Sequence, residues 1–310
     1  MTAISLPDLS VNLGGGLSIK NPVMTASGTF GYGLEFSPFY DISRLGCLIV
    51  KGLSREPVLG NPPQRIVETA SGMLNAIGLQ NIGVERFVRD VVPRLEDAGA
   101  TFAANIYGKT PEDYEAVAAR LSEVDALAAI EVNASCPNVK EGGIAFGSSP
   151  EGIARLTERV RRATRKPLWV KLSPNVTDVG AIAKAAEEAG ADAVTLINTL
   201  VGLAVDHRSR RPKLANVTGG LSGPAIKPVA LRMVWEVCRK VKIPVIGIGG
   251  IQSAEDALEF LLVGASAVQI GTANFRNPRV AAEVVEGIEA FLRTEKIASV
   301  AEYRGTLRLP

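Results

Sequence analysis

The sequence contains few of the residues that build disulfide frameworks and metal centres. Its 310 residues include three cysteines, one histidine and two tryptophans. Three irregularly spaced cysteines do not form a disulfide framework, and this pattern suits a reducing compartment. They are also too few to hold an iron–sulfur cluster of the four-cysteine type within this chain. The histidine, His207, lies next to Arg208 in a polar stretch and is more typical of a solvated loop residue than of a catalytic base.

The sequence also lacks long hydrophobic runs and a strong charge of one sign. No apolar run reaches the roughly 18 residues that a membrane helix needs, and the N-terminus has no basic segment followed by an apolar one, as a signal peptide would. The formal net charge is +2, whereas a dedicated nucleic-acid-binding protein has a concentrated basic face. We therefore expect a soluble, cytoplasmic protein that binds neither membranes nor nucleic acid.

What the sequence does contain is one alternating pattern. Short, nearly continuous apolar runs, typical of parallel strands covered on both faces, alternate with segments of helical periodicity. Thr110-Pro111, Ser149-Pro150 and Asn277-Pro278 each combine a capping residue with a proline suited to the first helical position. We predict one (β/α)8 barrel domain over residues 1–310, with a doubly wound sheet as the alternative. The expected strands are 23–26, 47–50, 102–105, 129–132, 168–171, 193–197, 245–248 and 267–270, and the expected helices are 84–98, 111–121, 150–163, 178–189, 225–241, 253–263 and 278–292.

Four segments depart from this pattern. Residues 1–22 contain two strand-like runs around glycines, which predict a hairpin that caps the base of the barrel. Insertions follow the second, fourth and sixth strands at 53–80, 139–147 and 199–224. Long loops in compact domains usually carry function. Neither of the two longer insertions has the pattern of an independent domain, and no complete helix is expected between the first two strands.

The segment Asn133-Ala-Ser-Cys136-Pro-Asn138 directly follows the fourth predicted strand. It places a thiol among amides at the strand's C-terminal end, where a (β/α)8 barrel builds its active site. A partly open polar setting of this kind favours thiol chemistry, and the alternative is a turn with an incidental buried cysteine. Cys47 and Cys238 lie within a predicted strand and a predicted helix, so we expect both to be inert core residues.

The other predicted strand ends carry amides, lysines and glycines but few carboxylates. Lysines and amides suit an electron-rich, oxygenated ring, and glycines after the seventh and eighth strands suit a phosphate that binds backbone N–H groups. The run Gly247-Ile-Gly-Gly250 lacks the third glycine of a dinucleotide fingerprint. Asn75–Asn81 could bind a ligand or hold its own loop. The strand-end residues are Ser27, Lys51, Gly52, Asn105, Asn133, Lys171, Asn198, Thr199, Gly249, Gly250, Gly271 and Thr272.

Together, these motifs resemble those of class 1 dihydroorotate dehydrogenases over almost the whole chain. The extension Val139–Gly147 is more similar to the NAD-linked class 1B than to the fumarate-linked class 1A. The resemblance implies a (β/α)8 barrel carrying FMN. It also implies that Cys136 takes the C5 proton of dihydroorotate while C6 gives a hydride to flavin N5. The motifs that carry it are Ala26–Phe30, Val50–Leu53, Asn75–Asn81, Asn133–Asn138, Val170–Ser173, Ile197–Thr199, Gly220–Gly223, Gly247–Gly250 and Ile270–Thr272.

The resemblance further implies the binding residues and a partner. Because this chain has too few cysteines for a cluster, electrons would reach NAD through a subunit with FAD and a [2Fe-2S] centre, in a heterotetramer of two copies each around a homodimer of this chain. The implied substrate-binding residues are Lys51, Asn75, Ala76, Ile77, Gly78, Leu79, Asn133, Asn198 and Thr199. The implied FMN-binding residues are Ser27, Lys51, Gly52, Asn105, Asn133, Lys171, Ile197, Gly223, Gly249, Gly250, Gly271 and Thr272.

Three alternatives remain open at this point. The chain could be the flavin subunit of a dihydropyrimidine dehydrogenase, which would act on uncharged pyrimidines. It could be a fumarate-linked class 1A enzyme. It could also be a catalytically silent barrel that binds FMN or a sugar phosphate.

Overall fold

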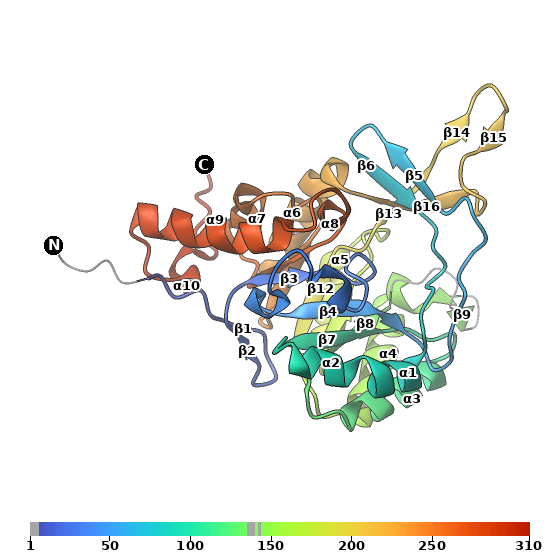
Figure 1. The fold of residues 1–310 in the computed structure, drawn as a ribbon, viewed down its shortest axis with the longest axis horizontal. Coiled ribbons are helices and arrows are strands. Elements are labelled where there is room, and N and C mark those ends of the chain that lie inside the picture. Colours follow the sequence, from blue (N-terminus) through green and yellow to red (C-terminus); the bar gives the residue numbers. More distant parts are fainter. Residues whose placement is uncertain (1–5, 135–139, 142–143) are drawn as a thin grey trace.

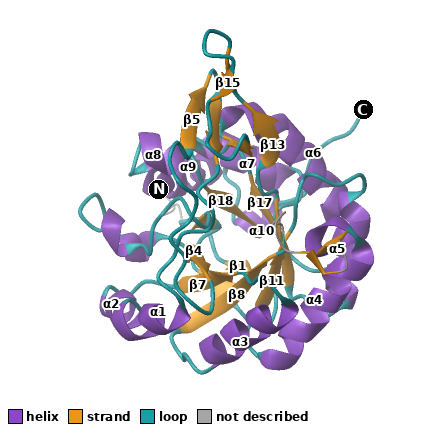
Figure 2. Cartoon of the chain, turned by 90° about the vertical axis from the view of Figure 1, so that its right-hand side faces the viewer, coloured by secondary structure: helices purple, strands orange, loops and turns teal. Residues whose placement is uncertain are grey.

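Eight parallel strands form the centre of the molecule. The computed structural model describes residues 6–134, 140–141 and 144–310. The strands follow the order β3-β18-β17-β12-β11-β8-β7-β4, and a parallel bridge between Met24 and Cys47 brings the two ends of this sheet together. Figures 1 and 2 show the strands inside a ring of helices, which confirms the (β/α)8 prediction. The strands are β3 (Val23–Thr25), β4 (Leu48–Leu53), β7 (Phe102–Ile106), β8 (Leu127–Asn133), β11 (Leu168–Lys171), β12 (Ala193–Leu196), β17 (Val245–Ile248) and β18 (Ala267–Ile270).

All eight predicted strands are present because their apolar runs are covered on both faces. Every residue of β11, β12, β17 and β18, for example, is buried. The helices pack around the outside of the barrel (Figure 2). They are α1 (Val84–Asp90), α2 (Val92–Asp97), α3 (Pro111–Ser122), α4 (Pro150–Ala163), α5 (Val179–Glu188), α6 (Lys227–Cys238), α7 (Ala254–Leu262), α8 (Ala273–Arg276), α9 (Val280–Glu295) and α10 (Val300–Tyr303).

Two helix predictions differ from the structure, and proline is involved in both. The helix expected at 84–98 is divided at Val91 into α1 and α2, because Pro93 has no N–H to continue the hydrogen-bond ladder. The expected start at Asn277-Pro278 is also wrong, since α9 begins at Val280 and Asn277 instead accepts a hydrogen bond from the Arg279 N–H. The capping residues Thr110 and Ser149 are confirmed, and each accepts a hydrogen bond from the backbone three residues later.

Helical segments also occur where no helix was expected. The short helices α8 and α10 were not predicted, and a 3₁₀ turn, η4 (Pro224–Ile226), precedes α6. Between β3 and β4 the chain forms only two 3₁₀ turns, η1 (Leu34–Phe36) and η2 (Ile42–Arg44). The prediction that this connection has no complete helix is therefore confirmed.

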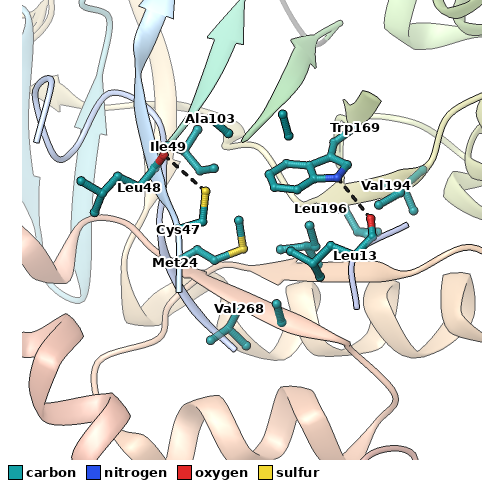
Figure 3. Close-up of a cluster of buried hydrophobic side chains, with 14 of the residues drawn as sticks. Leu13, Met24, Cys47, Leu48, Ile49, Ala103, Trp169, Val194, Leu196 and Val268 are labelled. Carbon is teal, nitrogen blue, oxygen red and sulfur yellow. Dashed lines mark hydrogen bonds between the residues drawn. The ribbon is translucent and has the colours of Figure 1, made fainter. Parts of the chain in front are cut away.

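The N-terminal hairpin lies against the starts of the barrel strands. Its strands, β1 (Val11–Asn12) and β2 (Ser18–Ile19), pair in antiparallel fashion. Leu13 is fully buried, and its carbonyl accepts a hydrogen bond of 3.3 Å from the Trp169 indole of β11 (Figure 3). Gly14, with a φ of +79°, lies directly against the backbone of Asp192, which precedes β12. The hairpin thus caps the end of the barrel opposite the predicted site.

The two long insertions form a shared sheet that was not predicted. The first contributes β5 (Ile66–Thr69) and β6 (Gly72–Asn75), and the second contributes β13 (Leu200–Leu203) and β16 (Thr218–Ser222). They pair in the order β13-β16-β6-β5, and Asn75 lies opposite Gly220. Figure 1 shows this sheet at one end of the barrel with the hairpin β14 (Val205–Asp206) and β15 (Arg211–Pro212) projecting beyond it. The insertion after β8 contains a short pair, β9 (Lys140–Glu141) and β10 (Ile144–Ala145).

Candidate active site

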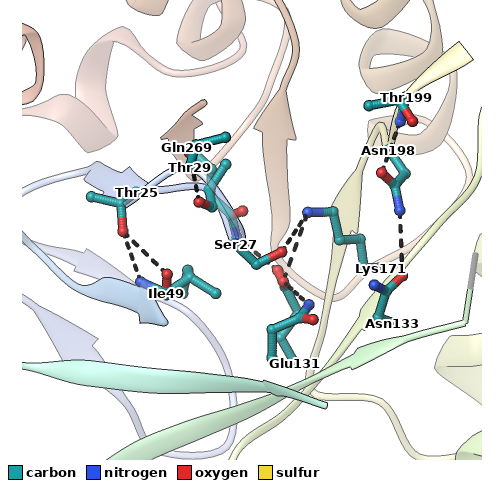
Figure 4. A network of polar contacts seen from close by, with 12 residues as sticks. Thr25, Ser27, Thr29, Ile49, Glu131, Asn133, Lys171, Asn198, Thr199 and Gln269 are labelled. Atoms are coloured by element: carbon teal, nitrogen blue, oxygen red, sulfur yellow. Dashed lines mark hydrogen bonds and ion pairs between the residues drawn. The ribbon is translucent and has the colours of Figure 1, made fainter. Parts of the chain in front are cut away.

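The C-terminal ends of the barrel strands bring the predicted polar residues together. Lys171, at the end of β11, donates a hydrogen bond of 3.2 Å to the Ser27 hydroxyl that follows β3. Asn198, after β12, donates from Nδ2 to Asn133 Oδ1 at the end of β8, at 3.3 Å. The Asn198 side chain in turn accepts from the Thr199 N–H at 2.8 Å (Figure 4). Residues from four strands, up to 144 positions apart in sequence, therefore form one polar surface.

Lys51 and Gly52 lie within β4, which extends to Leu53 and so beyond its predicted end. Lys51 is half-buried. Burial, and next the positive charge of Arg65, lower the pKa of its ammonium group below the ordinary lysine value. A side chain at Gly52 would place its Cβ 2.9 Å from Asn105 Oδ1. The absence of a side chain at Gly52 therefore leaves room for the Asn105 amide.

The Asn75–Asn81 segment is a turned loop whose backbone is held from two sides. Gly78 and Leu79 both have positive φ, +75° and +57°, a conformation that is uncommon for leucine. Asn81 Nδ2 and the Tyr107 hydroxyl each donate to the Leu79 carbonyl at 3.0 Å. Asn75 Nδ2 contacts the Gly220 carbonyl at 3.4 Å, which joins the loop to the second insertion. Ala76 and Ile77 are held as well, since both of their carbonyls accept hydrogen bonds from Asn61.

Glycines follow β17 and β18 at the C-terminal end of the barrel. Gly249 and Gly250 have φ values of +135° and +76°, and a Cβ at Gly249 would lie 2.7 Å from the Ala230 Cβ. Gly249 and Gly250 directly follow β17, and Gly271 and Thr272 directly follow the neighbouring strand β18, so four backbone N–H groups lie at adjacent strand ends. Nearby, the Thr272 hydroxyl donates to Ser222 at 2.7 Å. Such clustered backbone donors are suited to an anion such as phosphate.

Comparison with known proteins identifies the family. The family model for dihydroorotate dehydrogenase matches residues 9–292. The chain belongs to the dihydroorotate dehydrogenase family. It is 59% identical to the protein named dihydroorotate dehydrogenase B (NAD(+)), catalytic subunit, of Solidesulfovibrio magneticus, over 97% of this chain and 99% of that protein. It is 57% identical to the protein of the same name from Pelobacter propionicus, again over 97% and 99%.

A solved dihydroorotate dehydrogenase structure has the same fold. The Eimeria tenella enzyme, crystallised in complex with ferulenol, is 26% identical and superposes with a TM-score of 0.78. The alignment covers 96% of this chain and 88% of that one. None of the described helices of the present family member is long and apolar enough to cross a membrane.

Two of the three cysteines of this dihydroorotate dehydrogenase family member lie within the described residues. Cys47 is fully buried, and burial followed by the charge of Glu131 raises the pKa of its thiol. Burial also raises the pKa of Cys238, to about 12. Both thiols are therefore poorly suited to form thiolates, as expected for core residues. Cys136 lies outside the described residues. His207 is exposed in the β14–β15 turn, which agrees with its interpretation as a solvated loop residue.

Sequence reasoning missed a buried polar cluster inside the barrel. Glu131 of β8 and Gln269 of β18 are both fully buried. Glu131 accepts hydrogen bonds of 2.7 Å from Asn105 Nδ2 and from Gln269 Nε2. Among the described residues, neither Asn105 Oδ1 nor Gln269 Oε1 has a hydrogen-bond partner. A signal was present in the sequence, because each of these residues interrupts an otherwise apolar strand.

Proposed function

We propose that this chain oxidises dihydroorotate to orotate in the de novo pathway to pyrimidine nucleotides, with NAD as the final electron acceptor. The observation that carries the proposal is the similarity, 59% identity over 97% of the chain, to a protein named as an NAD-linked catalytic subunit. The barrel supports it with a polar surface at the strand ends that suits an oxygenated ring. The whole chain would act as one catalytic barrel in the cytoplasm.

FMN fits the barrel as the cofactor of this reaction. Among the described residues Asn105 Oδ1 has no partner and can accept a hydrogen bond from a ring N–H, and the glycine-rich backbone after β17 and β18 suits a phosphate. The Lys171 ammonium supplies positive charge next to the Ser27 hydroxyl. When bound, FMN supplies the acceptor for the hydride that leaves C6 of dihydroorotate. The residues proposed to hold it are Ser27, Lys51, Gly52, Asn105, Asn133, Lys171, Ile197, Gly223, Gly249, Gly250, Gly271 and Thr272.

The substrate is proposed to lie between the strand ends and the Asn75–Asn81 loop. Dihydroorotate carries a carboxylate, and the half-buried Lys51 ammonium is suited to bind it or to stabilise negative charge that develops during the reaction. The turn at Gly78 and Leu79 has a left-handed backbone that is held in place by hydrogen bonds to the Leu79 carbonyl. The proposed substrate-binding residues are Lys51, Asn75, Ala76, Ile77, Gly78, Leu79, Asn133, Asn198 and Thr199.

Cys136 is proposed as the base that removes the C5 proton. A thiol has an ordinary pKa of about 8.5, so that a modest lowering by nearby donors gives a usable thiolate fraction near neutral pH. The residue follows Asn133 by three positions, and Asn133 is fixed at the end of β8, where its carbonyl accepts a hydrogen bond of 2.9 Å from Tyr114. The Tyr114 hydroxyl thus holds the last residue of β8 in place.

Electrons are proposed to leave through a second protein. With three cysteines and one histidine, this chain cannot supply a four-cysteine cluster. Among its described residues no group of three His, Cys, Asp or Glu side chains is arranged to hold a metal. The name "catalytic subunit" of the relatives supports a complex. We infer a partner with FAD and a [2Fe-2S] centre, in a heterotetramer built on a homodimer of this chain.

An anaerobic absorbance experiment tests the reductive half of this proposal. The purified chain should carry an oxidised flavin band that bleaches when dihydroorotate is added. Cys136→Ala should retain the band but bleach far more slowly. Cys238→Ala, which removes a half-buried thiol elsewhere, should bleach like the wild type. Bleaching by dihydrouracil instead of dihydroorotate would indicate a dihydropyrimidine dehydrogenase. A flavin that no dihydropyrimidine reduces would refute the proposal.

A second experiment tests the acceptor. Reconstitution with a partner that contains FAD and a [2Fe-2S] centre should allow NAD reduction by dihydroorotate. Failure to reduce NAD with that partner bound, together with rapid turnover when fumarate is added, would instead assign the chain to the fumarate-linked type.

A further inference from the structure

A single carboxylate, that of Glu131, organises the interior of the barrel. Its side chain is fully buried, and both of its oxygens accept short hydrogen bonds. Oε1 accepts from Asn105 Nδ2 of β7 and Oε2 from Gln269 Nε2 of β18, each at 2.7 Å. Hydrogen bonds to an ionised acceptor are shorter and stronger than neutral ones. Glu131 therefore fixes two amides that come from different sides of the barrel.

Glu131 also provides the buried counter-charge of Lys171. The Lys171 ammonium lies 4.0 Å from Glu131 Oε1 and donates to the Ser27 hydroxyl (Figure 4). Glu131 and Lys171 are the two charged residues with buried side chains within the described parts of the chain. A buried charge is costly without an opposite charge nearby, and removal of one partner of such a pair leaves the other uncompensated.

The carboxylate determines which atom of the Asn105 amide remains available. Because Glu131 takes Nδ2, Oδ1 is the free end of the amide, and it accepts no hydrogen bond from any described residue. Gly52 leaves space beside that oxygen. The orientation of an amide follows from its partners. With Glu131 in place, Asn105 offers an acceptor, and the flavin ring has an N–H that can donate to it.

We propose that Glu131 is a positioning residue of the cofactor site that orients the Asn105 amide toward FMN. Its negative charge would also counteract the attraction between the Lys171 ammonium and negative charge on reduced flavin. This inference rests on the proposed FMN-dependent function. The negative charge of Glu131 makes the reduced state less favourable than Lys171 alone would make it. Glu131 thus has two proposed effects. It holds the Asn105 amide in the orientation that binds the cofactor, and it lowers the reduction potential of the bound flavin.

The decisive measurement is the flavin midpoint potential of holoenzyme carrying Glu131→Gln. Removal of one negative charge should raise the potential, because the reduced flavin then faces Lys171 without an opposing anion. A tenfold change in the reduction equilibrium corresponds to about 30 mV for a two-electron couple, and a rise of at least that size is expected. The control is Glu286→Gln, which removes one charge from an exposed ion pair with Arg44 on the outer surface. An unchanged or lowered potential in Glu131→Gln would overturn the charge part of the proposal.

Glu131→Asp tests orientation separately from charge. It retains the carboxylate but shortens its reach, so that the hydrogen bond to Asn105 weakens. We expect FMN affinity to fall by about fivefold or more, as for partial loss of one hydrogen bond to a charged group, with a potential closer to the wild type than that of Glu131→Gln. Wild-type FMN affinity in this variant would overturn the orientation part, even if Glu131→Gln does not fold. Failure of the wild-type chain to bind FMN would instead refute the proposed function.

Discussion

The contact between Gly52 and Asn105 allows a sharp test of the proposed cofactor site. In Gly52→Ala the new Cβ would lie 2.9 Å from Asn105 Oδ1, while its next neighbours, in Tyr107 and in the Asn105 side chain, are 3.6 and 4.0 Å away. Gly52 does not have a positive φ, so alanine introduces no backbone strain there. The substitution therefore disturbs one atom, the amide oxygen proposed to accept a hydrogen bond from FMN.

The expected effect is weaker FMN binding in a folded protein. Without cofactor, the Asn105 side chain can turn away from the new methyl group at the cost of an unfavourable rotamer, about 0.5–1.5 kcal/mol. With cofactor it must return, and overpacking of this kind costs about 1–3 kcal/mol. Only the difference between these two costs, about 0.5–1.5 kcal/mol, weakens binding, so we expect the Kd for FMN to rise by about two- to tenfold, since each 1.4 kcal/mol is a factor of ten. Titration of the apoprotein with FMN, followed by flavin fluorescence, measures this change.

A double-mutant cycle shows whether the loss passes through Asn105. If the methyl group acts by displacing the amide oxygen, Gly52→Ala should add little to the loss already caused by Asn105→Ala, since contacting residues are not additive. Fully additive losses would refute the reasoning, and so would wild-type FMN affinity in Gly52→Ala alone. Gly180→Ala, in the outer helix α5 at a position without positive φ where the new Cβ would meet only side-chain atoms of Lys240 and Asp178, reports any general effect of adding a methyl group to the chain.

Three other predictions follow from contacts around the barrel. Tyr107→Phe removes a hydroxyl that donates to the Leu79 carbonyl. Steady-state kinetics should therefore show a KM for dihydroorotate raised by about five- to tenfold, with unchanged FMN affinity. The control Tyr303→Phe, in α10, should change neither the KM nor the FMN affinity. Burial and the charge of Arg65 lower the pKa of Lys51, and a lysine loses its charge as pH rises through its pKa. The KM for dihydroorotate should therefore begin to rise at a pH below the ordinary lysine pKa of about 10.4. Lys51→Arg, which keeps its charge at such pH values, should flatten that rise. Trp169→Phe removes the hydrogen bond to Leu13 and leaves a gap, so the free energy of unfolding measured in urea should fall by about 1–3 kcal/mol. FMN affinity should not change, because the hairpin lies at the opposite end of the barrel from the proposed site.

The barrel itself was predictable because its signal is local. Runs such as Leu168–Lys171 and Ala267–Ile270 are mostly apolar and buried along their whole length, and this pattern is typical of parallel strands covered on both sides. Once eight such runs are placed in a barrel, their C-terminal ends must meet at one edge. The proximity of Lys171 to Ser27, and of Asn198 to Asn133, follows from that topology alone.

The sheet formed by the two insertions was not predictable in the same way. Asn75 pairs with Gly220 across 145 positions. Instead of an apolar run, β16 consists mostly of small or polar residues, namely Thr218, Gly219, Gly220 and Ser222. The pairing of β16 with β6 depends on where the barrel places the two insertions. The first insertion follows β4 and the second follows β12, so the two meet only because both leave the barrel at the same end. A pattern within either insertion cannot specify a partner in the other.

The Glu131 cluster lies between these two cases. That Glu131 and Gln269 interrupt apolar runs is visible in the sequence, and a buried charge requires partners. Which partners it finds depends on strand order, because Asn105 comes from the adjacent strand β7 whereas Gln269 is 138 positions away in β18 and reaches the same carboxylate only across the interior of a closed barrel. The sequence thus indicates that a carboxylate is buried in β8. The closure of the sheet determines that the donors to this carboxylate are the Asn105 and Gln269 amides. A polar residue within an apolar strand of a predicted barrel is therefore best examined against all strands that face the same interior, not against its sequence neighbours.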